Sequence, residues 1–269
     1  MGVVSRGARV PATSAPIERS AAPDAPTFEQ VFSGISDVQG WMTRGQAVRL
    51  WDRASDLRAG DRIVEIGSFH GRSAIVLASS APQGVEIVTI DPHGGNDRGP
   101  HEFEGFADEA ETDHQTFLAN LEAAGVRDRI RHLRAYSHAA ISDVDGDITL
   151  LYIDGAHRFA PALDDIRRWC PRVPLKGTVL IHDSFAAWGL TWAIYFTMLL
   201  SGKFRYVGRS NSMAEYQRVD LTPADRLANA FRQLLELPYF GRNLLIKVLI
   251  KAKLAPLTRL LGGDGRWPY

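Results

Sequence analysis

Two pairs of polar side chains that can bind a metal or move a proton follow two apolar segments of the chain. Asp154 ends the run L-L-Y-I-D, and His157 comes three residues later. His182 and Asp183 end the run T-V-L-I-H-D. An imidazole has a pKa suited to proton transfer near neutral pH, and carboxylate oxygens bind hard cations such as Mg²⁺. Together, the four residue types predict acid–base or metal-assisted chemistry.

The segment that carries them, Leu150 to Phe185, predicts two buried parallel strands joined by a crossover helix, with Gly177 opening the second strand. The carboxyl ends of parallel strands meet at the edge where open α/β sheets bind ligands. We therefore expect the four polar side chains to share one site. Taken singly, either histidine is equally compatible with a structural role at a strand end.

A glycine-rich turn lies between the first predicted strand, Arg62–Ile66, and a helix that begins near Ser73. Gly67 and Gly71 permit a tight turn and a close approach of a ligand to the backbone. The next predicted strand ends in Asp91, and an acid at that place can accept both ribose hydroxyls of a nucleoside. This order of elements is typical of the first half of a nucleotide-binding unit.

The turn departs from the fingerprint of dinucleotide-binding proteins. Phe69 stands where the second glycine of that fingerprint would be, and Glu65 precedes the first glycine by two residues. A carboxylate at this place would repel a pyrophosphate. It suits a ligand that carries a cationic amino group.

The pattern E-x-G-x-x-x-G-x-S, followed by an acid after the second strand, resembles the class I S-adenosylmethionine-dependent methyltransferases. The segments G-W-M-T, I-D-G-A-H and H-D-S resemble bacterial sugar O-methyltransferases related to the macrocin and mycinamicin enzymes, and the resemblance covers roughly residues 40–219. It implies that residues 65, 67, 68 and 73 surround the methionine part of the cofactor, that residue 91 binds the ribose and that residue 137 lies near the adenine. The predicted cofactor-binding set is Glu65, Gly67, Ser68, Gly71, Ser73, Asp91, Ser137 and Asp154.

The resemblance also implies a divalent metal, Mg²⁺ or Mn²⁺, and a base three residues after the first metal ligand. His157 is then the catalytic base, and the metal ligands are Asp154, His182 and Asp183. The related sugar and catechol enzymes tend to have a carboxylate at position 182. An imidazole there favours Mn²⁺ or another transition metal beside Mg²⁺, or else His182 only orients Asp183.

The sequence predicts a Rossmann-like, seven-stranded, mostly parallel sheet with helices on both faces and a C-terminal antiparallel hairpin. We expect a disordered tail over residues 1–26, a methyltransferase domain over 27–220 and a helical extension over 221–269. Trp188 and Trp192 belong to a predicted apolar helix and are expected to lie in the hydrophobic core. Within the extension, the sequence predicts a basic amphipathic helix from Arg242 to Leu261. Its apolar positions favour packing in an oligomer, such as a homodimer, or over the active site rather than contact with a membrane surface.

The formal net charge of zero argues against a nucleic-acid partner. Cys170 is the single cysteine, which excludes an internal disulfide and a cysteine-rich zinc site. No apolar run reaches the roughly 18 residues of a membrane span, so we expect no stable membrane insertion and a cytoplasmic location.

The sequence thus predicts a metal-dependent O-methyltransferase that acts on a sugar, an oligosaccharide or another polyhydroxylated small molecule. A catechol or phenol acceptor is the main alternative, although such a ring favours an aromatic slot. A nicotinamide-dependent oxidoreductase, a non-haem iron oxygenase and a non-catalytic nucleotide-binding module remain open. Four polar residues of the loop after the second strand could touch a polar acceptor, although each of them taken singly favours a solvated loop: His93, Asp97, His101 and Glu104.

Overall fold

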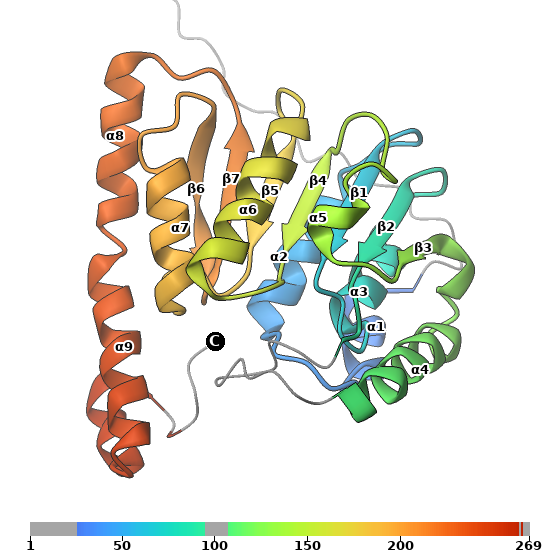
Figure 1. Ribbon diagram of the computed structural model, residues 1–269, viewed down its shortest axis with the longest axis horizontal. Helices are drawn as coiled ribbons and strands as arrows, with labels where there is room; N and C mark the ends of the chain where they lie inside the picture. Colours follow the sequence, from blue (N-terminus) through green and yellow to red (C-terminus); the bar gives the residue numbers. More distant parts are fainter. Residues whose placement is uncertain (1–25, 95–106, 264, 266–269) are drawn as a thin grey trace, which may run out of the picture.

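A seven-stranded sheet with the strand order β3-β2-β1-β4-β5-β7-β6 forms the centre of the computed structural model, which describes residues 26–94, 107–263 and 265 (Figure 1). The strands are β1 (Arg62–Ile66), β2 (Glu86–Ile90), β3 (Ile130–Leu133), β4 (Leu150–Ile153), β5 (Thr178–Ile181), β6 (Phe204–Ser210) and β7 (Met213–Arg218). Strands β1 to β5 run parallel, whereas β7 is antiparallel to both β5 and β6. The predicted fold class is confirmed.

Helices precede, connect and follow the strands. They are α1 (Phe28–Gly34), α2 (Arg44–Ser55), α3 (Arg72–Ser80), α4 (Ala107–Ala123), α5 (Ser137–Ala140), α6 (Phe159–Trp169), α7 (Trp188–Met198), α8 (Pro223–Leu234) and α9 (Leu237–Lys251). Short 3₁₀ turns are η2 (Arg127–Arg129), η3 (Cys170–Arg172) and η4 (Ala255–Leu261). Residues 97, 101 and 104 of the predicted acceptor loop lie outside the described residues, as does nearly all of the predicted tail.

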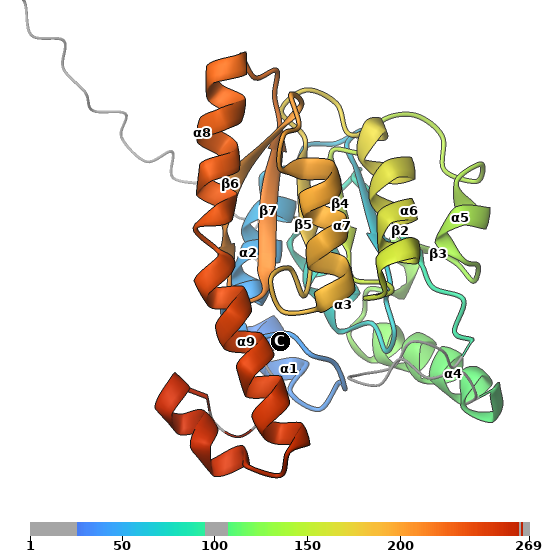
Figure 2. The same cartoon turned by 60° about the vertical axis from the view of Figure 1, so that its left-hand side comes forward.

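Two hydrophobic cores cover the two faces of the sheet, which explains why the parallel strands are apolar almost throughout. One core joins the strands to α5, α6 and α7, with Ile153, Ile166 and Ile194 among its buried residues. The other joins them to α2, α3 and α4, with Leu50 and Phe117 among its members. Figures 1 and 2 show these helices as layers on opposite sides of the sheet.

The turn after β1 depends on a glycine. Gly67 has a φ of +87°, and a Cβ atom there would overlap the carbonyl of Asp154 at the end of β4. Its backbone N–H donates to Ile90 at the end of β2, at 2.8 Å. Only a residue without a side chain can bring the ends of these three strands so close together. The close approach places the turn beside the predicted site residue Asp154.

The prediction that Trp188 and Trp192 are core residues is wrong. Their exposed fractions are 60% and 45%. The core-facing positions of α7 are taken instead by the buried residues Leu190, Ala193, Ile194 and Met198. An apolar helix shows no polar stripe that would reveal which side faces outward, so the sequence alone gave no warning.

The C-terminal extension packs along the edge of the sheet beside β6 and α7 (Figure 2). It is broken into shorter helices, and α9 ends at Lys251 rather than continuing to Leu261 as predicted. Buried Asn243 donates to the carbonyl of Phe185 at 3.1 Å, and Lys247 donates to Ala186 at 2.8 Å. These bonds tie the extension to the loop that follows β5. Within the described residues, no helix has the length and hydropathy needed to cross a membrane.

Gly67→Ala should destabilise the protein severely, because the added methyl group meets backbone at a positive φ. We expect a loss above about 4 kcal/mol or failure to fold. Gly125→Ala is the matched control: its φ is +66° but the space around it is open, so the loss should stay near 1 kcal/mol. Urea unfolding of both variants measures the difference, and equal losses would contradict the proposed close approach.

Candidate active site

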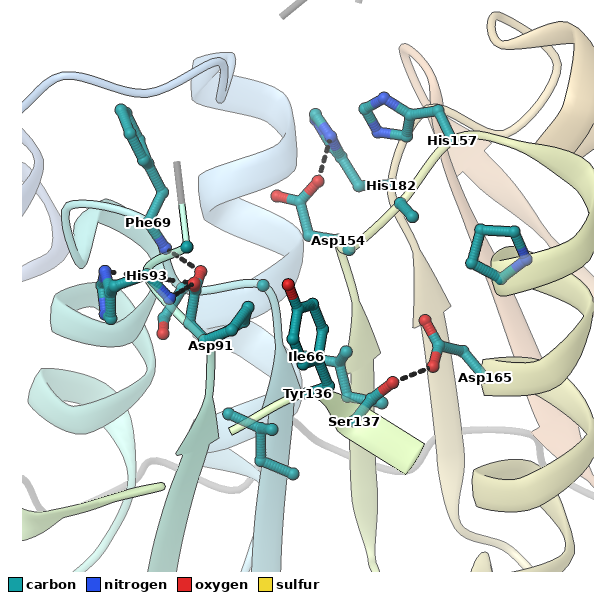
Figure 3. Close-up of a pocket in the computed structure, with 18 of the residues that line it drawn as sticks. Ile66, Phe69, Asp91, His93, Tyr136, Ser137, Asp154, His157, Asp165 and His182 are labelled. Atoms are coloured by element: carbon teal, nitrogen blue, oxygen red, sulfur yellow. Dashed lines mark hydrogen bonds and ion pairs between the residues drawn. The ribbon is translucent and has the colours of Figure 1, made fainter. Parts of the chain in front are cut away.

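A cavity of about 370 Å³ lies at the carboxyl edge of the parallel strands (Figure 3). Its walls come from the segment before α2, the β1–α3 turn, the end of β2, the start of α5, the β4–α6 loop and the end of β5. The cavity thus brings together segments from residue 39 to residue 183. It lies where an open α/β sheet binds its ligand.

The structure brings most of the predicted site residues to this cavity. The lining includes Gly67, Ser68, Ser73, Asp91, Ser137, Asp154, His157, His182 and Asp183. Two predicted residues lie outside it. Gly71 caps α3 and packs against Phe117 of α4, while Glu65 is wholly buried behind the turn. His93 also lines the cavity, as the predicted acceptor loop requires.

Backbone amides hold Asp91 in place. Its Oδ2 accepts from the N–H of Phe69 at 2.8 Å, and its Oδ1 accepts from the N–H of His93 at 2.7 Å. The first of these bonds crosses from the β1–α3 turn to the end of β2 (Figure 3). The carboxylate is therefore fixed at the cavity wall, and a carboxylate has further lone pairs that can accept from a ligand.

Glu65 stands directly behind the turn. Ser73 of α3 donates a hydrogen bond to it, and this bond joins the buried acid to a residue that lines the cavity. Burial raises the pKa of Glu65 to about 8, and the charges of Asp154 and Asp91 act in the same direction. Near neutral pH the side chain is thus mostly protonated in the free protein.

A second acid that sequence reasoning missed stands at the opposite end of the cavity. Ser137 donates to Asp165 of α6, whose pKa burial raises to about 6. Tyr136 lies next to Ser137 and is half exposed. Asp165 is the polar member of an otherwise apolar helix face, which is the one sequence signal that could have found it.

The four polar side chains that follow β4 and β5 lie in one site, as predicted: Asp154, His157, His182 and Asp183. The Nδ1 of His182 lies 2.8 Å from Oδ1 of Asp154 (Figure 3), and Tyr152 donates to Oδ2 of Asp154 at 2.8 Å. The Nε2 of His157 lies 3.4 Å from Oδ2 of Asp183. The backbone carbonyl of His157 accepts from Leu190 of α7 at 3.0 Å, which holds the β4–α6 loop in place.

His182 is the buried cation of this cluster. Burial lowers its pKa, but the carboxylates of Asp154 and Asp183 and the backbone of Trp41 outweigh that effect and raise the pKa to about 9. Burial conversely raises the pKa of Asp183, yet His182, His157 and Lys247 and the hydroxyl of Ser212 bring it below its usual value. The imidazolium of His182 thus offsets one of the two negative charges of Asp154 and Asp183.

Residues far away in the sequence hold Asp183. Ser212, in the turn between β6 and β7, donates to Oδ1 of Asp183 at 3.1 Å. Gln46 of α2 donates to Ser212 at 3.1 Å, while its amide oxygen accepts from the backbone of Thr43 at 2.7 Å. Thr43 is the N-cap of α2, and its capping box fixes the orientation of the Gln46 amide. Gln46 and Ser212 are fully buried.

The donor set does not fit the divalent metal that the resemblance implies. Both oxygens of Asp154 accept hydrogen bonds, and the Nδ1 of His182 donates one of them. A nitrogen that carries a proton has no lone pair left for a metal. Throughout the described part of the chain, no three His, Cys, Asp or Glu side chains are arranged to hold a metal ion.

Two aromatic rings form a wall that the sequence interpretation did not foresee. Trp41 and Phe69 stack with ring centroids 5.6 Å apart, and both line the cavity. Trp41 precedes α2, and Phe69 lies in the β1–α3 turn at a φ of +42°. The wall can bind a flat ring or the apolar face of a sugar.

A cluster of three histidines packs behind the end of β2. The ring of His93 lies 5.2 Å from that of His114 and 5.1 Å from that of His132, and Phe117 packs against His132 at 4.5 Å. Burial lowers the pKa of His132 to about 3, and neighbouring charges of His93 and His114 add to the shift. These rings are therefore neutral in the folded protein near neutral pH.

The part of the chain that carries the cavity matches a known family. Residues 64–184, fewer than half of the chain, match the family described as a methyltransferase domain. A stretch of 127 residues is 28% identical to an uncharacterized protein of Sinorhizobium fredii. That stretch covers 46% of this chain but only 13% of the relative, so the chain spans a small part of that protein's length.

Solved structures share the fold over most of the chain. The cofactor-bound protein Rv0187 from MTB has a TM-score of 0.53 at 15% identity, covering 72% of this chain and 88% of that one. The O-methyltransferase TomG from Streptomyces achromogenes, involved in tomaymycin synthesis and solved with S-adenosylmethionine, has a TM-score of 0.51 at 16% identity, covering 74% and 91%.

At these identities the likeness shows the fold, which is the Rossmann-like methyltransferase fold. The comparisons thus give a match of residues 64–184 to a methyltransferase domain and a shared fold.

The buried histidines should make the protein sensitive to mild acid. Because the folded pKa of His132 is depressed, its contribution to stability is present above the unfolded pKa of about 6.5 and is lost as the pH falls from there towards 3. His132→Phe should reduce the proton uptake on unfolding by about half a proton at pH 6.5 and by about one proton at pH 5. Urea midpoints measured across that range test this, with the exposed His138→Phe as control. Parallel pH curves for all three proteins would contradict it.

Proposed function

We propose that this protein transfers a methyl group from S-adenosylmethionine to a hydroxyl oxygen of a sugar or another polyhydroxylated small molecule. The observation that carries the proposal is the single cavity lined by the glycine turn of β1, the acid after β2 and the base candidate His157. A nucleoside-binding acid and a proton acceptor in one cavity are the two features that such a transfer requires.

The cofactor would lie along the ends of β1 and β2. Asp91 would accept the ribose hydroxyls, and Gly67, Ser68 and Ser73 would surround the methionine part. The start of α5, with Tyr136 and Ser137, would flank the adenine. When bound, the cofactor supplies an electrophilic methyl group on a sulfonium; the protein holds it against the acceptor oxygen.

His157 would take the proton of the acceptor hydroxyl. Asp183, 3.4 Å from its Nε2, would orient the ring and stabilise its charged form. The acceptor would lie between His157 and the Trp41–Phe69 wall, and apolar faces of sugar rings as well as phenols can pack on such a wall. No step of the proposed transfer uses a metal, because the donor atoms of Asp154, His182 and Asp183 do not fit one. The same hydrogen bond of His182 Nδ1 argues against an iron oxygenase site at this place.

Calorimetric titration with S-adenosylhomocysteine tests the cofactor assignment. Asp91→Asn should weaken binding at least about tenfold, since hydrogen bonds to charged groups contribute about 1.5–3 kcal/mol each. Asp128→Asn, an exposed acid away from the cavity, is the matched control and should leave the affinity unchanged. If the unaltered protein does not bind S-adenosylhomocysteine, the proposed function is wrong.

His157→Ala separates chemistry from binding. Loss of a general base should lower turnover by roughly 10²- to 10⁴-fold, while the affinity for S-adenosylhomocysteine stays the same. Methyl uptake from labelled S-adenosylmethionine, screened over sugar and catechol acceptors, provides the assay. Unchanged turnover in the variant would reject His157 as the base.

Glu65→Gln should separate stability from cofactor binding. Because the folded pKa of Glu65 is raised to about 8, its carboxyl weakens the fold progressively as the pH rises from about 4.5 to 8. The variant should therefore melt higher than the unaltered protein at pH 8, and the gain should shrink at pH 5.5. A cationic amino group near the turn would favour ionised Glu65, so the affinity for S-adenosylhomocysteine should rise between pH 6 and 8 only in the unaltered protein. Identical pH profiles would refute the assignment.

A further inference from the structure

The carboxylates that would hold a divalent cation are already bound by hydrogen-bond donors of the protein. Asp154 accepts from Tyr152 and from His182, each at 2.8 Å, through different oxygens. Tyr152 is fully buried and belongs to β4 itself.

The ring of His182 is oriented as a donor and not as a ligand. Its Nδ1 faces Oδ1 of Asp154 at 2.8 Å and lies 3.8 Å from Oδ1 of Asp183. The other ring nitrogen, Nε2, points away from Nδ1, so a metal bound to it could not also contact the carboxylate of Asp154. The side chain of His182 is buried.

The carboxylate oxygens of Asp183 also have partners within the protein. Ser212 donates to its Oδ1, and Gln46 in turn donates to Ser212. Its Oδ2 faces His157. The carboxylates of Asp154 and Asp183 therefore converge on an imidazole from two adjacent strand ends, in the arrangement that carboxylates adopt around a cation.

We propose that the imidazole of His182 occupies the place of a divalent metal between Asp154 and Asp183, and that the methyl transfer proceeds without a metal. The second half rests on the proposed function, whereas the first concerns metal binding and stands without it. A carboxylate at position 182 would complete a set of three acidic ligands, which hard cations prefer. The residue at position 182 thus decides whether the carboxylates of Asp154 and Asp183 bind a metal or accept hydrogen bonds from a donor of the protein.

Binding of Mn²⁺ alone, followed by electron paramagnetic resonance, tests the first half without any activity. His182→Glu should bind Mn²⁺ at least about tenfold more tightly than the unaltered protein, and adding Asp154→Asn should remove the gain. His182→Gln is the matched control, because it removes the imidazole without supplying a carboxylate. Thermal melting and S-adenosylhomocysteine binding establish that each variant is folded.

Equal Mn²⁺ binding by the unaltered protein and His182→Glu, or binding by neither, overturns the proposal. So does Mn²⁺ binding by the unaltered protein that Asp154→Asn abolishes. Turnover of the unaltered protein should be the same before and after treatment with EDTA, and a loss restored by Mg²⁺ overturns the second half. Failure of the protein to bind S-adenosylhomocysteine would instead reject the proposed function and leave the metal-binding result intact.

Discussion

The imidazole of His182 and the carboxylate of Asp154 meet because β4 and β5 run parallel and in register. Ile153 lies opposite Ile181, so the residues that follow the two strands emerge side by side at the same edge of the sheet. Gly67 brings the turn after β1 against the same place, where a side chain would overlap Asp154. The whole cavity depends on this convergence. The β1–α3 turn and the β4–α6 loop, which carries His157, belong to different crossover units, and each is positioned by the strand that precedes it.

Burial favours the neutral form of the groups at and around the cavity, and His182 and Asp183 are the two exceptions among those discussed. It moves the pKa of Glu65 to about 8, that of Asp165 to about 6 and that of His132 to about 3, in each case towards the neutral form. His182 keeps its proton because the carboxylates of Asp154 and Asp183 outweigh its burial, and the partners of Asp183 likewise outweigh the burial of that carboxyl group. A buried cation without such partners would lose its proton. The ends of β4 and β5 therefore concentrate charge at one point of the cavity.

The sequence predicted what depends on local pattern and parallel topology. Apolar runs that end in acids located the strands and the site edge, and the glycine spacing located the turn at Gly67. The sequence could not reveal contacts between distant segments, such as Ser137 with Asp165 or Gln46 with Ser212, because each partner alone is an ordinary polar residue. The error at Trp188 has a related cause, since the direction in which an apolar helix faces is set by its neighbours. The site-residue roles and the domain boundaries remain predictions.

The antiparallel hairpin belongs to the site, although it follows the last parallel strand and contributes no residue to the cavity lining. Its turn carries Ser212, which bonds to Asp183, and β7 carries Glu215, which pairs with Arg49 and Arg53 of α2. The same helix supplies Gln46, whose amide orientation is fixed by its own capping box. A local signal at the start of α2 therefore orients a buried aspartate at the end of β5, through one side chain of the hairpin. Because the Gln46–Ser212 and Ser212–Asp183 hydrogen bonds are buried, loss of one partner would leave the next unsatisfied, and such groups are costly to bury. The hairpin and α2 thus hold Asp183 rigidly beside His157.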